Sequence, residues 1–306
     1  MAQLIIGTRG SALALAQSKM VKARLEALAP DLRVDLQIIK TTGDKMTDSP
    51  LANLGGKGVF TKEIEEALLD RRVDLAVHSL KDLPTQLPPG LTVGAVLERE
   101  DPRDCLVSRF GEQLLELPSG SVVGTSSLRR QAQIRAAKKN IRVQDTRGNL
   151  DTRLKKVAEG EFTAVVVAYA GVRRLGRADE VSEVIPLEIM LPAPGQGFIA
   201  IEIREGDEAT AAWVKRLNHE MSFRSATAER AFLAGLGGGC RVPIAAHARA
   251  DGNRLVMDGL VISVDGQRLL RVKDQGPLTD PLGLGNLLAA RALEKGAANI
   301  LKETVS

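Results

Sequence analysis

The sequence predicts an α/β protein with a smaller α+β region at its C-terminal end, and three features of the pattern support this class. Short apolar runs alternate with amphipathic stretches of helical period through the first two thirds of the chain. Two segments that contain proline, 98–104 and 191–197, interrupt this alternation and indicate crossings between domains. Beyond residue 217 a helical stretch is followed by alternating strands, which is typical of a separate α+β unit.

The length of 306 residues is enough for two or three domains. An apolar strand, Phe198–Glu202, resumes directly after the second crossing, so we expect the chain to return there to its first domain. The predicted domains are residues 1–98 with 197–216, residues 99–196, and residues 217–306.

Composition narrows the class of function. Lys and Arg number 42 against 38 Asp and Glu, and aromatic residues are 3% of the chain, which is poor material for base-stacking sites and counts against a nucleic-acid binder. Two cysteines do not form a disulfide framework, and the N-terminus lacks a signal peptide, so we expect a cytoplasmic protein. No apolar run approaches the roughly 20 residues of a membrane span. The sequence has no long apolar stripe of the kind that packs against another subunit, so we expect a monomer.

The first strand, Leu4–Gly7, leads into a polar turn and then a helix whose apolar face runs from Leu13 to Leu28. Ser11 is the expected N-cap of that helix, which leaves Arg9 in the turn. Free backbone N–H groups gather in such a turn and suit an anion. The alternative is an ordinary strand-to-helix connection, and Arg9 favours anion binding.

The segment Thr41–Gly58 is long, polar and rich in glycine, and we interpret it as a mobile loop that can carry Asp44 and Lys57 over a site. A plain flexible loop is the open alternative. The order of residues in a phosphate-binding loop is absent, because Gly58 follows Lys57. An amphipathic helix begins near Phe60.

An acidic residue follows the buried strand that begins at Val73. The strand ends in His78 and Ser79, and Lys81 and Asp82 follow it. Pro84 prevents a helix or a central strand from continuing after these residues. Open α/β sheets carry their chemistry at such strand ends, so Asp82 is a candidate working residue. By itself the pattern favours an Asp and a Lys in a solvated turn, because strand ends are commonly polar. We interpret His78 as structural.

Arginines recur at the ends of strands in the second region. The predicted strands Val122–Thr125, Ile141–Asp145 and Ala164–Ala168 are each followed by arginine, and Thr125 and Ser127 can cap the helix after the first. Such strand ends lie along one edge of a sheet, and the arginine fork binds carboxylates bidentately. The pattern predicts a polyanionic ligand, with a solvated basic face as the alternative. These arginines are Arg129, Arg130, Arg147, Arg153, Arg173 and Arg174.

The C-terminal region contains the more unusual of the two cysteines. Cys240 follows three glycines and precedes Arg241, an environment that favours the thiolate. It suits a nucleophile, a covalent anchor or a redox thiol, with a cysteine in a tight turn as the alternative. Cys105 lies in an apolar strand and is expected to be buried. The three histidines are scattered, so no metal site is expected. A final helix is expected over Pro281–Lys302.

Taken together, these motifs resemble the porphobilinogen deaminase (hydroxymethylbilane synthase) family, in the family's order and over nearly the whole chain. The chain departs from the family's usual residues at Tyr169 and Arg241. The matching segments are Gly7–Gln17, Gly55–Phe60, His78–Asp82, Glu98–Asp104, Gly124–Gln131, Arg147–Arg153, Ala170–Gly176, Leu191–Gly197, Ala228–Arg230 and Gly238–Ile244.

The resemblance implies two domains like the halves of a periplasmic binding protein with a central cleft, and a third that holds the cysteine loop. It implies a dipyrromethane cofactor joined to Cys240 by a thioether, porphobilinogen as substrate, and Asp82 as the catalytic residue. It further implies cofactor contacts from Lys81, Ser127, Arg129, Arg130, Arg147, Asp44, Ser79 and Thr125, and substrate contacts from Arg9, Ser11, Arg153, Arg174, Phe60 and Lys57. The rival interpretation is a non-catalytic two-lobed binding protein for an acidic small molecule, which leaves Cys240 and the third domain unexplained.

Overall fold

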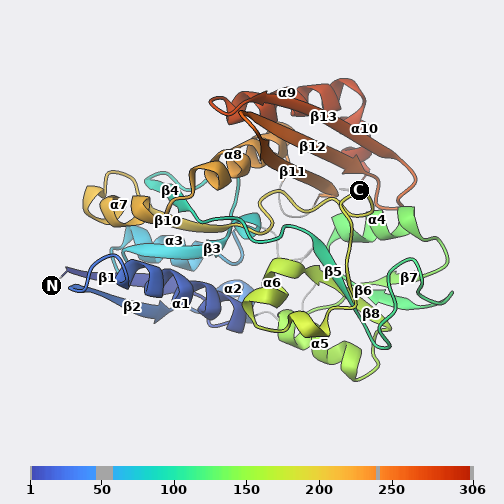
Figure 1. The fold of residues 1–306 in the computed structure, drawn as a ribbon, viewed down its shortest axis with the longest axis horizontal. Helices are drawn as coiled ribbons and strands as arrows, with labels where there is room; N and C mark the ends of the chain where they lie inside the picture. Colours follow the sequence, from blue (N-terminus) through green and yellow to red (C-terminus); the bar gives the residue numbers. More distant parts are fainter. Residues whose placement is uncertain (1, 46–57, 239–241, 304–306) are drawn as a thin grey trace. The chain divides into compact units, whose positions relative to one another are not determined.

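The computed structural model describes residues 2–45, 58–238 and 242–303 (Figure 1). The expectations for Lys57, Cys240 and Arg241 therefore lie outside the described residues. The chain divides into two compact units, one of residues 1–99 with 198–223 and the other of residues 100–197 with 224–306. The division into three domains stays a prediction. No helix among the described residues has the length and apolar character to cross a membrane.

The first unit is a five-stranded sheet in the order β2-β1-β3-β10-β4. Strands β1, β2 and β3 run parallel, and β10 is antiparallel to both of its neighbours. The return of the chain after the second crossing thus places β10 inside the sheet. The elements are β1 (Ala2–Thr8), α1 (Ala12–Glu26), β2 (Leu32–Ile38), α2 (Thr42–Lys45), α3 (Lys62–Leu69), β3 (Leu75–Ser79), the 3-10 helix η2 (Leu80–Asp82), β4 (Leu91–Val96), β10 (Ile199–Arg204), α7 (Glu208–Val214) and the 3-10 helix η4 (Lys215–Leu217).

Side chains that alternate along β1 supply both faces of this sheet. Leu4 and Ile6 pack in one core with Val21 of α1, whereas Ile5 packs in the other with Ile64 of α3. Helices on both faces make the sheet doubly wound.

The second unit repeats this arrangement and adds a three-stranded sheet. Its five-stranded sheet has the order β7-β6-β8-β5-β9, in which β5 is antiparallel to β8 and β9. The elements are β5 (Asp104–Ser108), β6 (Val122–Gly124), α4 (Leu128–Ala137), β7 (Arg142–Gln144), α5 (Leu150–Ala158), β8 (Ala164–Ala168), α6 (Tyr169–Arg174), the 3-10 helix η3 (Ala178–Glu180) and β9 (Glu183–Val184).

The C-terminal part has a core of its own. Helix α8 (Glu220–Gly235) contributes Ala228 and Phe232, which pack with residues of an antiparallel sheet and of two final helices. A smaller cluster joins Ala132 of α4 to Ala245 and Leu260 of that sheet, so these parts form one compact unit. The remaining elements are β11 (Ile244–Asp251), β12 (Arg254–Ile262), β13 (Leu269–Pro277), α9 (Pro281–Glu294) and α10 (Ala297–Lys302).

The predicted α/β class with a C-terminal α+β part is confirmed, and two local expectations are corrected. The expected helix over Pro281–Lys302 is broken at Gly296, whose φ of 94° is a left-handed conformation that glycine adopts readily. The expected loop that starts at Thr41 contains the short helix α2, whose Gly43 N–H donates to the carbonyl oxygen of Val59 at 2.9 Å.

Candidate functional site

The turn between β1 and α1 has the capped helix start that the sequence predicts. Ser11 is the N-cap of α1, and its hydroxyl accepts a hydrogen bond from the Ala14 N–H at 3.3 Å. The side chain of Thr8 at the end of β1 is fully buried and accepts a hydrogen bond from the Ser18 hydroxyl of α1. This bond holds the strand against the helix at the turn. The first turn of α1 contains no acidic residue. The end of the helix therefore stays positive and suits an anion.

Arg9 leaves this turn already engaged by two neighbours. Its guanidinium donates to the Asp44 carboxylate, with 2.5 Å from Nη2 to Oδ1, and lies 4.2 Å from the centroid of the Phe60 ring. Burial alone would raise the pKa of Asp44, but the hydrogen bonds from Arg9 and Thr41 outweigh it and hold that pKa below its ordinary value. Three of the predicted contact residues, Arg9, Asp44 and Phe60, are thus brought together.

Asp82 lies at the end of the 3-10 helix that follows β3. The strand itself is buried, and the Leu80 N–H donates to the carbonyl oxygen of Phe198 at 3.1 Å, which ties the start of this helix to the chain beside β10. Asp82 is exposed, and Lys81 beside it is half-buried. The carboxylate of Asp82 is therefore accessible to a ligand from solvent.

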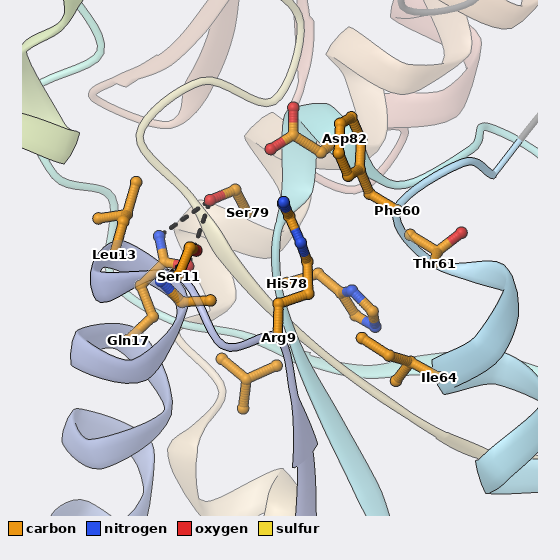
Figure 2. A pocket seen from close by; sticks show the side chains of 12 residues that line it. Arg9, Ser11, Leu13, Gln17, Phe60, Thr61, Ile64, His78, Ser79 and Asp82 are labelled. Carbon is orange, nitrogen blue, oxygen red and sulfur yellow. Dashed lines mark hydrogen bonds between the residues drawn. The ribbon is translucent and has the colours of Figure 1, made fainter. Parts of the chain in front are cut away.

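A pocket in the first unit gathers these elements (Figure 2). Gln17 of α1 donates to the Ser79 hydroxyl at 2.9 Å and so links the helix to the end of β3. Acidic, cationic and hydroxyl groups meet apolar side chains here, as in sites for small polar ligands. The lining residues are Arg9, Ser11, Leu13, Ala14, Gln17, Phe60, Thr61, Ile64, Val77, His78, Ser79 and Asp82.

The pocket has a wall that sequence reasoning missed. His78 lines it and is 6% exposed, and its Nε2 lies 2.9 Å from Oε2 of the fully buried Glu202 on β10. The sequence interpretation left His78 structural, and the structure adds that its side chain lines the same pocket as Asp82. A single signal existed in the sequence, since Glu202 is an acidic residue inside an apolar run and such residues are rarely buried without a partner.

In the second unit, two predicted arginines share one buried carboxylate. Arg129 and Arg130 are 3% and 5% exposed, and both bond the fully buried Asp104 of β5 at 2.7 Å. Gln196 donates to the same carboxylate at 2.9 Å. Burial would raise the pKa of Asp104, but the two arginines hold it well below its ordinary value. Sequence reasoning missed Asp104, whose single carboxylate bonds both arginines and leaves the three groups with a net positive charge.

The other predicted residues of this unit lie in the turns and helices that follow its parallel strands, with Arg153 inside α5 and Arg174 at the end of α6. Ser127 is the N-cap of α4, and the fully buried Thr125 accepts a hydrogen bond from the Ser127 N–H at 3.3 Å. Arg147 is half-buried, Arg153 bonds the carbonyl oxygen of Gly148, and Arg174 bonds that of Gly197 at 2.6 Å. Backbone carbonyl groups of the same unit therefore hold the side chains of Arg153 and Arg174.

Cys105 is buried, as predicted, and burial raises the pKa of its thiol to about 12. A thiol of this kind is inert at neutral pH. Among the described residues, no group of His, Cys, Asp and Glu is arranged to hold a metal ion.

Comparison with known proteins gives one family. A family model described as "Porphobilinogen deaminase, dipyromethane cofactor binding domain" matches residues 4–212, and "Porphobilinogen deaminase, C-terminal domain" matches residues 223–294. Porphobilinogen deaminase of Syntrophomonas wolfei is 46% identical over 304 residues, 99% of each chain. That of Syntrophus aciditrophicus is 48% identical over 297 residues, 97% of each chain.

Proposed function

Because this chain belongs to the porphobilinogen deaminase family, we propose that it condenses four porphobilinogen molecules head to tail and releases ammonia at each step. Hydrolysis then frees the linear tetrapyrrole hydroxymethylbilane. The match of a cofactor-binding family model over residues 4–212 is the observation that carries this function. A non-catalytic binding protein is not favoured, because full-length relatives are enzymes of this family.

The capped turn at Ser11 suits the acidic side chains of the substrate. Each pyrrole carries an acetate and a propionate, so every added ring brings two negative charges. Arg9 supplies a fork that binds a carboxylate bidentately, and the N-terminus of α1 supplies backbone N–H groups. Since Arg9 already forms an ion pair with Asp44, a carboxylate of the substrate competes with the Asp44 carboxylate for the Arg9 guanidinium.

Asp82 is the proposed catalytic residue. Loss of ammonia from porphobilinogen leaves a cation on the substrate, and the attacking pyrrole also becomes cationic. An accessible carboxylate in a pocket beside buried groups stabilises both cations and can transfer protons at the leaving amine. The position of Asp82 at the end of η2 supports this role.

The family's dipyrromethane cofactor supplies the pyrrole to which the first substrate is joined. The donors present fit an acidic group of this kind, because they are cationic or hydroxyl-bearing and because Arg129 Nε is buried without a hydrogen-bond partner among the described residues. We propose Cys240 as the covalent anchor. The proposed cofactor contacts are Lys81, Ser127, Arg129, Arg130, Arg147, Asp44, Ser79 and Thr125, and the proposed substrate contacts are Arg9, Ser11, Arg153, Arg174, Phe60 and Lys57.

We also propose that the protein is a cytoplasmic monomer that binds no nucleic acid. Two cysteines in 306 residues and a 3% aromatic content support this proposal.

Replacement of Asp82 tests the catalytic proposal. Asp82→Asn keeps the shape of the side chain and removes its charge, so we expect turnover to fall by about 10²–10⁴-fold. Ammonia release and hydroxymethylbilane formation from porphobilinogen measure it. Intact mass shows whether each preparation carries the cofactor, and Cys240→Ser should lack that added mass.

Asp31→Asn is the matched control, because Asp31 is an exposed aspartate of the same unit outside the pocket. It should keep the parent turnover. An Asp82→Asn enzyme with parent turnover and the cofactor mass would remove Asp82 from the mechanism. An active parent without any added mass would contradict the cofactor assignment.

A further inference from the structure

The first unit buries a histidine between the pocket and two carboxylates. His78 of β3, Glu202 of β10 and Glu65 of α3 are 6%, 0% and 6% exposed. Oε2 of Glu202 binds His78, whereas Oε1 of Glu202 and Oε1 of Glu65 are buried without hydrogen-bond partners among the described residues. Buried polar groups without a hydrogen-bond partner are uncommon in folded proteins, so each of these two oxygens calls for an explanation. The proposed reaction, as described above, uses none of the three.

The hydrogen bond to Glu202 fixes how the imidazole faces the pocket. A carboxylate accepts only, so Nε2 carries the proton that it donates to Glu202. In the neutral ring, Nδ1 then holds a lone pair. Among the described residues Nδ1 has no hydrogen-bond partner, and the ring lines the same pocket as Asp82. A carboxylate that orients an imidazole and leaves its other nitrogen toward a ligand is the arrangement of a general base.

Charged groups from four elements lie around the ring and its pocket. Glu202 on β10 bonds the ring and Glu65 on α3 interacts with it electrostatically, whereas Arg9 in the turn before α1 and Asp82 on η2 line the same pocket. Burial raises the pKa of Glu65, the charges of Glu202 and Glu66 raise it further, and Thr61 and His78 lower it.

We propose that His78 is a second proton-transfer residue of the pocket, with Glu202 as its positioning residue. The proposal rests on the proposed function. In each coupling step the C–N bond of porphobilinogen breaks, a C–C bond forms to the attacking pyrrole, and that pyrrole must then lose the hydrogen on its bonded carbon as a proton. His78 Nδ1 accepts this proton and passes it to the ammonia that was released when the C–N bond broke, and this ammonia leaves the pocket as ammonium. Asp82 can then remain a carboxylate beside the next cation.

Chemical rescue separates this role from a structural one. His78→Ala should retain the cofactor mass and lose about 10²-fold in kcat, and added imidazole should restore part of that loss. Structural damage would not respond to imidazole. His219→Ala is the matched control, because His219 lies in the same unit outside the pocket and bonds Ser222. It should keep the parent kcat and show no rescue.

Nitrogen NMR of the parent protein supports or overturns the proposal even where His78→Ala fails to fold. Only three histidines contribute signals, so assignment is direct. In its neutral form the His78 ring should carry the proton on Nε2. In Glu202→Gln the amide can donate to Nε2, so the Nδ1–H tautomer should appear and kcat should fall.

The outcomes distinguish the two proposals. A parent protein that releases no ammonia from porphobilinogen would contradict the proposed function. An active parent together with a cofactor-loaded His78→Ala enzyme of equal kcat would overturn the role of His78 alone. A neutral His78 that carries its proton on Nδ1 would overturn it as well.

Discussion

The two five-stranded sheets of this protein share one plan and differ in what their inserted strand carries. Both place three parallel strands beside an antiparallel fourth strand, and a fifth strand, β4 or β9, pairs with that fourth one. In each sheet a parallel strand is followed by a helix that a serine caps, Ser11 or Ser127. A buried threonine, Thr8 or Thr125, lies shortly before each serine. The antiparallel strands, β10 and β5, each bring one fully buried carboxylate, Glu202 or Asp104.

The partners of these two carboxylates differ. Asp104 meets two arginines and a glutamine, so its charge is compensated. Glu202 meets one histidine and keeps an unpaired oxygen near Glu65. The same backbone plan therefore supports a compensated ion pair in one unit and an under-compensated group beside a pocket in the other. An under-compensated buried group is the more common sign of chemistry.

The largest effect should come from the compensated pair. Asp104→Asn leaves two buried guanidiniums without their carboxylate, and we expect the second unit to lose about 3–5 kcal/mol of stability. Glu202→Gln is the equivalent change in the first unit. It should cost less, about 1.5–3 kcal/mol, because one hydrogen bond to a charged group is altered.

Hydrogen exchange resolved by peptide measures both variants, since it reports each unit separately. Faster exchange confined to peptides of residues 100–197 and 224–306 is expected for Asp104→Asn. If Glu202→Gln proved the more destabilising change, the contrast between the two carboxylates would be wrong.

An intermediate effect should come from the helix caps, and it should be similar in both units. Ser11 and Ser127 each satisfy one backbone N–H of their helix, at 3.3 and 3.5 Å. Replacement of either by Ala should cost about 1 kcal/mol of helix stability. The exchange of amides in the first turn of α1 or α4 should rise about fivefold. A much larger loss at one cap would show that the two turns are not equivalent.

The finest test is the sign of the pH dependence. The pKa of Asp104 is lowered on folding, so the stability it contributes is present above the unfolded pKa of about 4 and is lost as the pH falls further. The pKa of Glu65 is raised, so folding retains a proton that the unfolded chain has lost. Its effect is a loss of stability as the pH rises from about 4 toward the folded pKa.

Urea unfolding at several pH values measures these opposite slopes. Near-ultraviolet circular dichroism reports the first unit through Trp213 and the second through Tyr169, the sole residues of their types. Glu65→Gln mimics the protonated side chain and should flatten the slope of the first unit only. A steeper slope in that variant would contradict the raised pKa.

Most of the secondary structure could be predicted from the sequence, because its signals are local. The strand Ala164–Ala168 was predicted to the residue, and the N-caps Ser11 and Ser127 followed from their place before an amphipathic run. The break at Gly296 was missed, since apolar periodicity continues across it and only the backbone reveals the left-handed turn.

The candidate site was predicted in part. Arg9 and Asp82 were singled out from their segments and Phe60 by the family resemblance, and the structure gathers all three in one pocket. The contacts with Glu202 and Asp104 could not be foreseen, because each carboxylate lies on a strand that is inserted between two strands distant from it in the sequence.

By itself the sequence determined the elements, their caps and the family to which the chain belongs. These depend on side-chain period and on motifs a few residues long. Only the tertiary structure decided which charges meet. His78 and Glu202 are 124 residues apart, and Asp104 and Arg129 are 25 apart. Whether a buried charge is compensated depends on such long-range pairs, since the cost of burying it is set by the groups within a few ångströms rather than by its neighbours along the chain.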